Sequence, residues 1–227
     1  MTSYDRCRSN VFAGGAAEPL GGDISVDRSL YISINQFADR TAWAHGIVRF
    51  YANDGVALFA ALLLAGWWLG RSSTNPLPGV GRAVWAGAGA LLALALNQPI
   101  GAAVDRGRPY TVIANMHLLV DKTKDFSFAS DHATIAGGVA AGLWLLDRRL
   151  GLVAGVCAVA MAFARVYVGA HYPGDVAAGL LLGAAITLAL SGIGRRLLEP
   201  LLSAVAKTPL RPILVRRTPG NPGATTA

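Results

Sequence analysis

Long uninterrupted apolar segments are the feature that most constrains this chain. The clearest runs from Ala83 to Val104, 22 residues without a charged side chain, and the run from Val176 to Gly194 is nearly as clean. A bilayer crossing by a helix needs about 20 consecutive apolar residues. Only 15% of the residues are charged, whereas a typical soluble domain has roughly 25%. The sequence therefore predicts an integral-membrane protein.

The apolar segments also predict the fold class. They number five and lie at about residues 55–70, 83–104, 131–146, 150–170 and 174–194. Residues 147–149 are an Asp-Arg-Arg turn between the third and fourth segments, which indicates a tight helical hairpin. Upstream, residues 29–50 mix apolar and polar side chains at loosely helical spacing, which is typical of a helix that lies on the membrane surface. We predict an all-α, integral-membrane helical bundle of about five transmembrane helices with an N-terminal interfacial helix.

Composition divides the chain into three parts. Residues 1–28 form a polar leader without the basic-then-apolar order of a signal peptide. Residues 29–196 contain all the predicted membrane segments. Residues 197–227 form a basic tail, rich in Pro, Gly and Thr from about residue 207, which we predict to be disordered.

The distribution of basic residues bears on partners and orientation. The net charge is +7, but no basic-aromatic recognition module is visible, so we predict a lipid and membrane partner and no nucleic acid. Five spans place loop 71–82, turn 147–149 and the tail on one side. The arginines close to span ends there are Arg71, Arg82, Arg148, Arg149, Arg195 and Arg196. The positive-inside rule then puts this side in the cytoplasm and loop 105–130 outside, although the outer side is also basic.

Three polar clusters interrupt the apolar pattern, and the predicted topology brings all three to the outer side. They are residues 105–109 (DRGRP), residues 127–132 (SFASDH) and residues 165–175 (RVYVGAHYPGD). Ionisable groups at the mouth of a membrane span are costly, so a functional hypothesis is the default for them. An arginine at a span end is alternatively a snorkelling anchor, and a carboxylate there alternatively favours a helix N-terminus. Convergence of three separate stretches favours a site.

The residue types in these clusters suit phosphate chemistry. Arginine supplies a rigid, permanently charged fork for phosphate oxygens, and histidine exchanges protons or attacks near neutral pH. Asp175 follows His171 by four residues, so on a helix both would share a face and the carboxylate could fix the imidazole tautomer. Ser130 and the amides that open the third span could bind an anion.

These stretches resemble the type-2 phosphatidic acid phosphatase superfamily, whose pattern is KxxxxxxRP, PSGH and SRxxxxxHxxxD. Arg108 and Pro109 match the end of the first motif, and Ser130 and His132 match the second. Arg165, His171 and Asp175 match the third at the required spacing. The resemblance covers roughly residues 97–190.

The resemblance implies a role for each matching residue. His171 would be the nucleophile that forms a phosphohistidine, Asp175 its orienting partner, and His132 the general acid. Arg108, Arg165 and Ser130 would cradle the phosphate, and Asp131 and Arg106 are further candidates for phosphate binding. Neither a metal nor another cofactor is implied.

Three positions depart from the family pattern. Gly101 stands where the first motif has lysine, and Arg106 is a candidate to supply the missing charge. Ala129 and Ala164 replace the proline of the second motif and the serine of the third. The Ser-Asp-His form of the second motif is similar to undecaprenyl diphosphate phosphatases of the bacitracin-resistance type.

The resemblance therefore predicts hydrolysis of a polyprenyl (undecaprenyl or decaprenyl) diphosphate to the monophosphate. With the orientation given by the positive-inside rule, we expect this reaction in the plasma membrane and on its extracytoplasmic face. Phosphatidylglycerophosphate, phosphatidic acid and a lipid-linked sugar phosphate are alternative substrates. A lipid transporter that binds headgroups without chemistry is the alternative from another class. The sequence does not define the oligomeric state.

Overall fold

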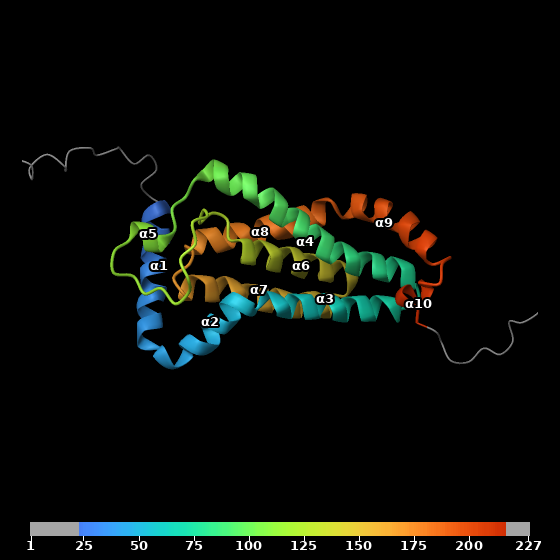
Figure 1. Ribbon diagram of the computed structural model, residues 1–227, viewed down its shortest axis with the longest axis horizontal. Coiled ribbons are helices and arrows are strands. Elements are labelled where there is room, and N and C mark those ends of the chain that lie inside the picture. Colours follow the sequence, from blue (N-terminus) through green and yellow to red (C-terminus); the bar gives the residue numbers. More distant parts are fainter. Residues whose placement is uncertain (1–22, 217–227) are drawn as a thin grey trace, which may run out of the picture.

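The computed structural model describes residues 23–216, and every regular element in that range is a helix (Figure 1). The elements in chain order are α1 (Asp23–Arg40), the 3₁₀ turn η1 (Ala42–Ala44), α2 (His45–Asp54), α3 (Val56–Arg71), α4 (Pro76–Val104), α5 (Pro109–Val112), α6 (Asp131–Leu146), α7 (Arg148–Tyr167), α8 (Pro173–Ala189), α9 (Ser191–Val205) and α10 (Arg211–Leu214).

The predicted all-α membrane fold is confirmed. Helices α3, α4, α6, α7 and α8 correspond to the five apolar segments and form the bundle in Figure 1. Within residues 23–216, two stretches, 76–112 and 148–167, are long and apolar enough to cross a membrane. Up to four do so if two bent helix pairs, α2 with α3 and α8 with α9, each count as one span. Helix α6 has 16 residues, fewer than the roughly 20 of a typical crossing.

Helix α6 is the centre of the bundle, because it packs against α4, α7 and α8 (Figure 1). Its inward positions are small or aliphatic, and Ala133, Ala136, Val139 and Leu143 are almost completely buried. Small residues let helix backbones approach closely, which is how membrane helices gain packing energy. Helices α6 and α8 approach most closely at positions such as Gly137, where a Cβ would overlap the backbone of Leu180 in α8.

The outer surface of the bundle is apolar. Large hydrophobic side chains such as Leu64, Leu91, Val156 and Leu181 are each more than 60% exposed. They come from four different helices, α3, α4, α7 and α8. A lipid environment removes the cost that water would impose on such a surface, so these faces fit a bilayer.

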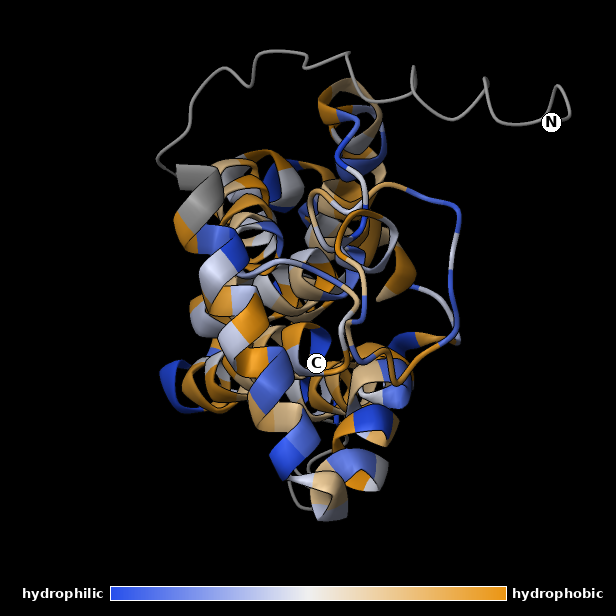
Figure 2. Cartoon of the chain, turned by 90° about the vertical axis from the view of Figure 1, so that its left-hand side faces the viewer, coloured by the Kyte–Doolittle hydropathy of each residue, from blue (hydrophilic) through white to orange (hydrophobic). Residues whose placement is uncertain are grey.

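Helix α1 does not run with the bundle but lies across one end of it (Figures 1 and 2). Tyr31 and Ala38 of α1 are fully buried against the bundle end, whereas Val26, Leu30 and Phe37 are at least half exposed. One face of α1 thus packs against the bundle, and another face exposes apolar side chains. This arrangement matches the helix expected over residues 29–50, although η1 and α2 divide that stretch.

The boundaries predicted for both ends of the chain need correction. Helix α1 begins at Asp23, so residues 23–28 belong to a helix and residues 1–22 lie outside the described range. The predicted disordered tail from residue 197 is wrong as far as residue 216, because α9 and α10 continue the fold there. Leu202 and Leu214 are buried against Val80 of α4. Charged residues and prolines interrupt the leucines of this segment, and this concealed the apolar anchors. Residues 217–227 lie outside the described range.

The α6–α8 contact provides a test of the packing. A Cβ at Gly183 of α8 would overlap the carbonyl oxygen of Thr134 and lie 2.7 Å from the amide nitrogen of Gly138. We expect Gly183→Ala to destabilise the protein by about 1–3 kcal/mol, the usual cost of overpacking, and to lower the melting temperature measured in detergent.

Gly155 of α7 is the matched control, because a Cβ there meets no atom within 4 Å. Gly155→Ala should leave the melting temperature unchanged or raise it, since alanine is favoured over glycine in a helix by up to about 1 kcal/mol. Equal melting temperatures for the two variants would contradict the close packing of α6 on α8.

Candidate active site

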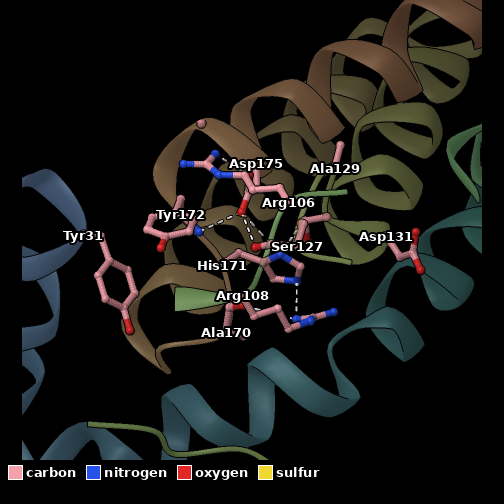
Figure 3. A network of polar contacts seen from close by, with 12 residues as sticks. Tyr31, Arg106, Arg108, Ser127, Ala129, Asp131, Ala170, His171, Tyr172 and Asp175 are labelled. Atoms are coloured by element: carbon pink, nitrogen blue, oxygen red, sulfur yellow. Dashed lines mark hydrogen bonds and ion pairs between the residues drawn. The ribbon is translucent and has the colours of Figure 1, made fainter. Parts of the chain in front are cut away.

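The three polar clusters meet at the end of the bundle that α1 covers (Figure 3). Asp105 ends α4 in a left-handed conformation, with φ of 50°, and the chain then turns so that Arg106 and Arg108 face the bundle end. Loop 113–130 leads to the start of α6, and the turn 168–172 joins α7 to α8. The convergence predicted from topology is confirmed by the hydrogen bonds that link the clusters.

His171 occupies the centre of this network and is 2% exposed. Its Nδ1 lies 2.8 Å from the carbonyl oxygen of Ser127, and its Nε2 lies 3.2 Å from Nη1 of Arg108 (Figure 3). A carbonyl only accepts, so Nδ1 carries the proton and donates it to Ser127. A guanidinium only donates, so Nε2 presents its lone pair to Arg108. The two contacts therefore select the tautomer with a free Nε2.

The electrostatic environment keeps this imidazole neutral. Burial lowers the pKa of His171 well below its usual value, and the positive charges of Arg165 and Arg108 lower it further. Near pH 7 the ring is therefore unprotonated at Nε2. An unprotonated ring nitrogen beside arginines is suited to attack an electrophile that carries negative charge.

Arg108 is nearly buried and fixed on three sides. Nη1 also donates to the carbonyl of Ala170 over 3.1 Å, and Nη2 forms an ion pair with Asp125 at 2.9 Å. Burial of Asp125 raises the pKa of that carboxyl, but the hydrogen bond from Thr123 and the Arg108 charge outweigh burial and leave the pKa below its usual value. Asp125 thus occupies an anion-binding edge of Arg108.

A cavity of about 140 Å³ lies beside His171. Its lining includes Arg108, Arg165, Asp131 and His132, together with His171 itself. Arg165 donates through Nη1 to the carbonyl of Ala52 over 3.1 Å, whereas its buried Nε has no hydrogen-bond partner. An unpartnered charged donor in a buried site is costly, so an anion that reached it would relieve that cost.

Two of the predicted phosphate-binding residues have particular positions. Ser130 is the N-cap of α6, is completely buried and has a hydroxyl without a hydrogen-bond partner, but it does not line the cavity. Asp131 does line it, and its Oδ1 accepts from the side-chain amides of Asn97 at 2.7 Å and Gln98 at 3.1 Å. Figure 3 shows Asp131 away from the imidazole network.

Asp175 is completely buried behind His171, but the two side chains are not in direct hydrogen-bonding contact. Its Oδ2 lies 3.9 Å from Nδ1 of His171, and it accepts from the hydroxyl of Ser127 and the amide of Tyr172 instead. The sequence predicted that Asp175 orients His171. In the structure the carboxylate of Asp175 accepts a hydrogen bond from the hydroxyl of Ser127, and the carbonyl of Ser127 accepts one from the imidazole ring.

Arg106 lies on the far side of Asp175 from the cavity and is not among the cavity-lining residues. Nη1 is 2.6 Å from Oδ1 of Asp175, and Nη2 is 2.6 Å from Oδ2 of Asp27 in α1. Its guanidinium carbon is 4.0 Å from the centre of the Tyr172 ring. Both Nη groups of Arg106 are therefore already engaged, so its predicted role in phosphate binding stays a prediction.

Gly101 lines the cavity at the position where the family pattern has lysine. A Cβ there would lie 2.6 Å from the carbonyl oxygen of Phe128. The backbone just before the second motif thus lies where a lysine side chain would have to pass. The departure seen in the sequence has a physical basis in this close approach.

Sequence reasoning missed several residues that shape the site: Asp27, Asn97, Asp125 and Ser127. Asn97 was visible as a polar residue inside an apolar run, and it donates to the carbonyl of Ala129 over 2.8 Å. The role of Ser127 is carried partly by its backbone carbonyl, which no residue type reveals. Among residues 23–216, no cluster of three His, Cys, Asp or Glu residues is arranged to hold a metal.

An imidazole lone pair flanked by arginines, at one end of an apolar helical bundle, fits transfer of a phosphoryl group from a lipid phosphate. Fold and site together define a membrane phosphatase. The chain belongs to the PAP2 superfamily, whose sequence profile matches residues 82–197. It is a hydrolase that acts on lipid phosphates.

Two curated relatives and one solved structure illustrate this membership. The undecaprenyl-diphosphatase BcrC of Bacillus subtilis is 26% identical over 69% of this chain and 78% of that protein. The decaprenylphosphoryl-5-phosphoribose phosphatase of Mycobacterium tuberculosis is 40% identical over 48% of this chain and 59% of that protein. The transmembrane PAP2-type phosphatidylglycerolphosphate phosphatase of Bacillus subtilis superposes with a TM-score of 0.56 at 22% identity, covering 76% of this chain and 86% of that one. The similarity to this solved structure is a similarity of fold.

The tautomer of His171 can be measured directly. We expect ¹⁵N spectra of histidine-labelled protein to show Nδ1 protonated and Nε2 unprotonated, with no protonation between about pH 8 and about pH 6.5, the usual pKa of histidine. Because the pKa is lowered, the ring gains its second proton only at still lower pH. His171→Gln identifies the resonances, and a ring that titrates near the usual value would contradict the site geometry.

Proposed function

We propose that this chain hydrolyses a polyprenyl diphosphate to the monophosphate, with His171 as nucleophile. The observation that carries the proposal is the free Nε2 of His171, held in a buried cavity beside Arg108 and Arg165. The Ser-Asp-His form of the second motif and the similarity to the undecaprenyl-diphosphatase BcrC support the diphosphate substrate.

The reaction has two steps in this proposal. Nε2 of His171 attacks the terminal phosphorus, the N–P bond forms, and the bond from phosphorus to the bridging oxygen breaks. His132 gives a proton to that leaving oxygen, which departs as the lipid monophosphate. His132 then takes a proton from water as the water attacks the phosphohistidine and releases inorganic phosphate.

Arg108 and Arg165, which both line the cavity, stabilise the charge on the phosphoryl oxygens during both steps. Stabilisation of developing charge by preorganised donors is usually the largest catalytic effect. On binding, the phosphoryl group replaces Asp125 as the anion beside Arg108. That exchange keeps the guanidinium paired before and after substrate enters.

A lipid-linked sugar phosphate is the second candidate substrate. The 40% identity to the decaprenylphosphoryl-5-phosphoribose phosphatase favours it, although that match covers about half of this chain. Both candidates share a polyprenyl tail and a terminal phosphate. They differ in the group that leaves, which is a lipid monophosphate in one case and a sugar hydroxyl in the other.

Phosphate release by detergent-purified protein tests the proposal. The panel contains polyprenyl diphosphate, polyprenyl-phosphoryl pentose phosphate, phosphatidylglycerophosphate and phosphatidic acid, each with chelator present. We expect the diphosphate to give the highest kcat/KM and His171→Ala to abolish release. Because arginines supply the positive charge, chelator should not reduce the rate. His117→Ala, a change at an exposed histidine outside the cavity lining, is the matched control.

The outcomes separate the candidates. Preference for the pentose phosphate would move the assignment to the second substrate, and preference for a glycerolipid would exclude both polyprenyl substrates. Full activity of His171→Ala would exclude His171 as nucleophile. Binding of all four lipids without phosphate release would favour the alternative of a lipid transporter.

We further propose that the site faces the outside of the plasma membrane. Basic residues near span ends at the opposite end of the bundle support this orientation through the positive-inside rule. Lys122, on the loop beside the site, and Arg148, at the other end, are both exposed.

Cysteine labelling tests the orientation. In a background with Cys7 and Cys157 replaced by serine, we expect Lys122→Cys to react with a membrane-impermeant maleimide on intact cells. Arg148→Cys should react only after the membrane is permeabilised. The reverse pattern would place the site in the cytoplasm.

A further inference from the structure

We propose that Asp27 and Arg106 are positioning residues that connect helix α1 to the catalytic turn through the buried carboxylate of Asp175. The inference rests on the proposed function, because it assigns a rate effect to residues that lie outside the cavity. It gives Arg106 a role distinct from the predicted binding of substrate phosphate. It also gives α1 a function besides lying on the membrane.

The starting point is the burial of Asp175, which is completely buried. A buried carboxylate is costly unless it is paired and hydrogen-bonded. Ser127 and the amide of Tyr172 satisfy Oδ2, and Arg106 supplies the positive charge at Oδ1 over 2.6 Å. Without Arg106 the carboxylate would lose the one cation that contacts it within residues 23–216 and would shift or take up a proton.

Asp175 passes this effect to the nucleophile through Ser127. The hydroxyl of Ser127 donates to Asp175, and the carbonyl of the same residue accepts from Nδ1 of His171 over 2.8 Å. Displacement of Asp175 therefore moves the acceptor that fixes the imidazole tautomer. A rate loss is expected although neither Arg106 nor Asp27 contacts the cavity.

Asp27 holds the other side of Arg106 and also the start of α8. Its Oδ2 is 2.6 Å from Nη2 of Arg106, and its Oδ1 accepts from the amide of Gly174 over 2.7 Å. Gly174 is the second residue of α8, one before Asp175. One carboxylate from α1 thus fixes both the guanidinium and the helix that carries Asp175.

Helix α1 repeats this type of contact along one face. Tyr31 donates from its hydroxyl to the carbonyl of Gly169 over 3.3 Å, and its ring centre is 5.4 Å from that of Tyr172. Asn35 exchanges two hydrogen bonds with the backbone of His117, at 2.7 and 2.9 Å. Asp27, Tyr31 and Asn35 are spaced by four residues, so they share one face of the helix. This face of α1 therefore makes hydrogen bonds to the chain on both sides of His171, at Gly169 and at Gly174.

Steady-state kinetics with inorganic phosphate as competitor test the proposal. We expect Arg106→Gln to lower kcat by up to about 100-fold, the loss that a misplacement of about 1 Å of a reacting group can cause, with little change in KM or in inhibition by phosphate. Arg106→Lys should recover part of the rate because it keeps the charge. Asp27→Asn should lower kcat less, and adding it to Arg106→Gln should cost little more, since the two residues act as a unit.

Two exposed residues on the same N-terminal helices are matched controls, Arg40→Gln in α1 and Asp54→Asn in α2. Both should retain the wild-type kcat. A large rise in KM and weaker inhibition by phosphate in Arg106→Gln, with kcat retained, would instead assign Arg106 to phosphate binding. Unchanged kinetics in both Arg106→Gln and Asp27→Asn would overturn the proposal.

Amide hydrogen exchange distinguishes failure of this inference from failure of the proposed function. We expect Arg106→Gln and Asp27→Asn to increase exchange in residues 169–176, where the amides of Tyr172 and Gly174 lose fixed acceptors, and to leave exchange in α6 and α7 unchanged. This measurement needs no substrate. If wild-type protein were inactive on every lipid tested, increased exchange in the two variants would still support the positioning role of Asp27 and Arg106. Unchanged exchange would reject that role.

Discussion

The hydrogen bond from Nδ1 of His171 to the carbonyl of Ser127 is the interaction on which the site depends. It fixes which ring nitrogen is free, and it requires loop 113–130 to approach the turn between α7 and α8. Asp175 completes that approach, since its carboxylate accepts from the hydroxyl of the same serine. A backbone carbonyl only accepts, so Nδ1 stays the donor, and Asp175 acts on the ring through the position of Ser127.

The helical bundle keeps loop 113–130 and the turn 168–172 at a fixed distance from each other. Helices α6, α7 and α8 reach the site from the far end of the bundle through closely packed small residues, and close packing resists relative sliding. Apolar faces on α3, α4, α7 and α8 keep the bundle in lipid. A substrate anchored by its tail therefore meets the site at the end of the helices, where a lipid phosphate group lies.

The sequence predicted the parts of this structure that depend on residue type and spacing. Apolar runs located the five bundle helices, and polar residues at their ends located His171, Arg108 and Arg165 at one site. It did not reveal the contact of Asp27 with Arg106, because residues 79 positions apart show no pattern. It also missed α9 and α10, since their leucines, among them Leu202 and Leu214, are interrupted by charged residues and prolines and form no continuous apolar run.

The close approach of Gly101 to the carbonyl of Phe128 limits which residues position 101 can hold. Any side chain there would push on the loop that leads to Ser130 and His132. A single substitution therefore cannot place a lysine at position 101 without disturbing the groups beside it. The glycine and the loop constrain each other, so positive charge in this cavity has to come from other positions, such as Arg108 and Arg165.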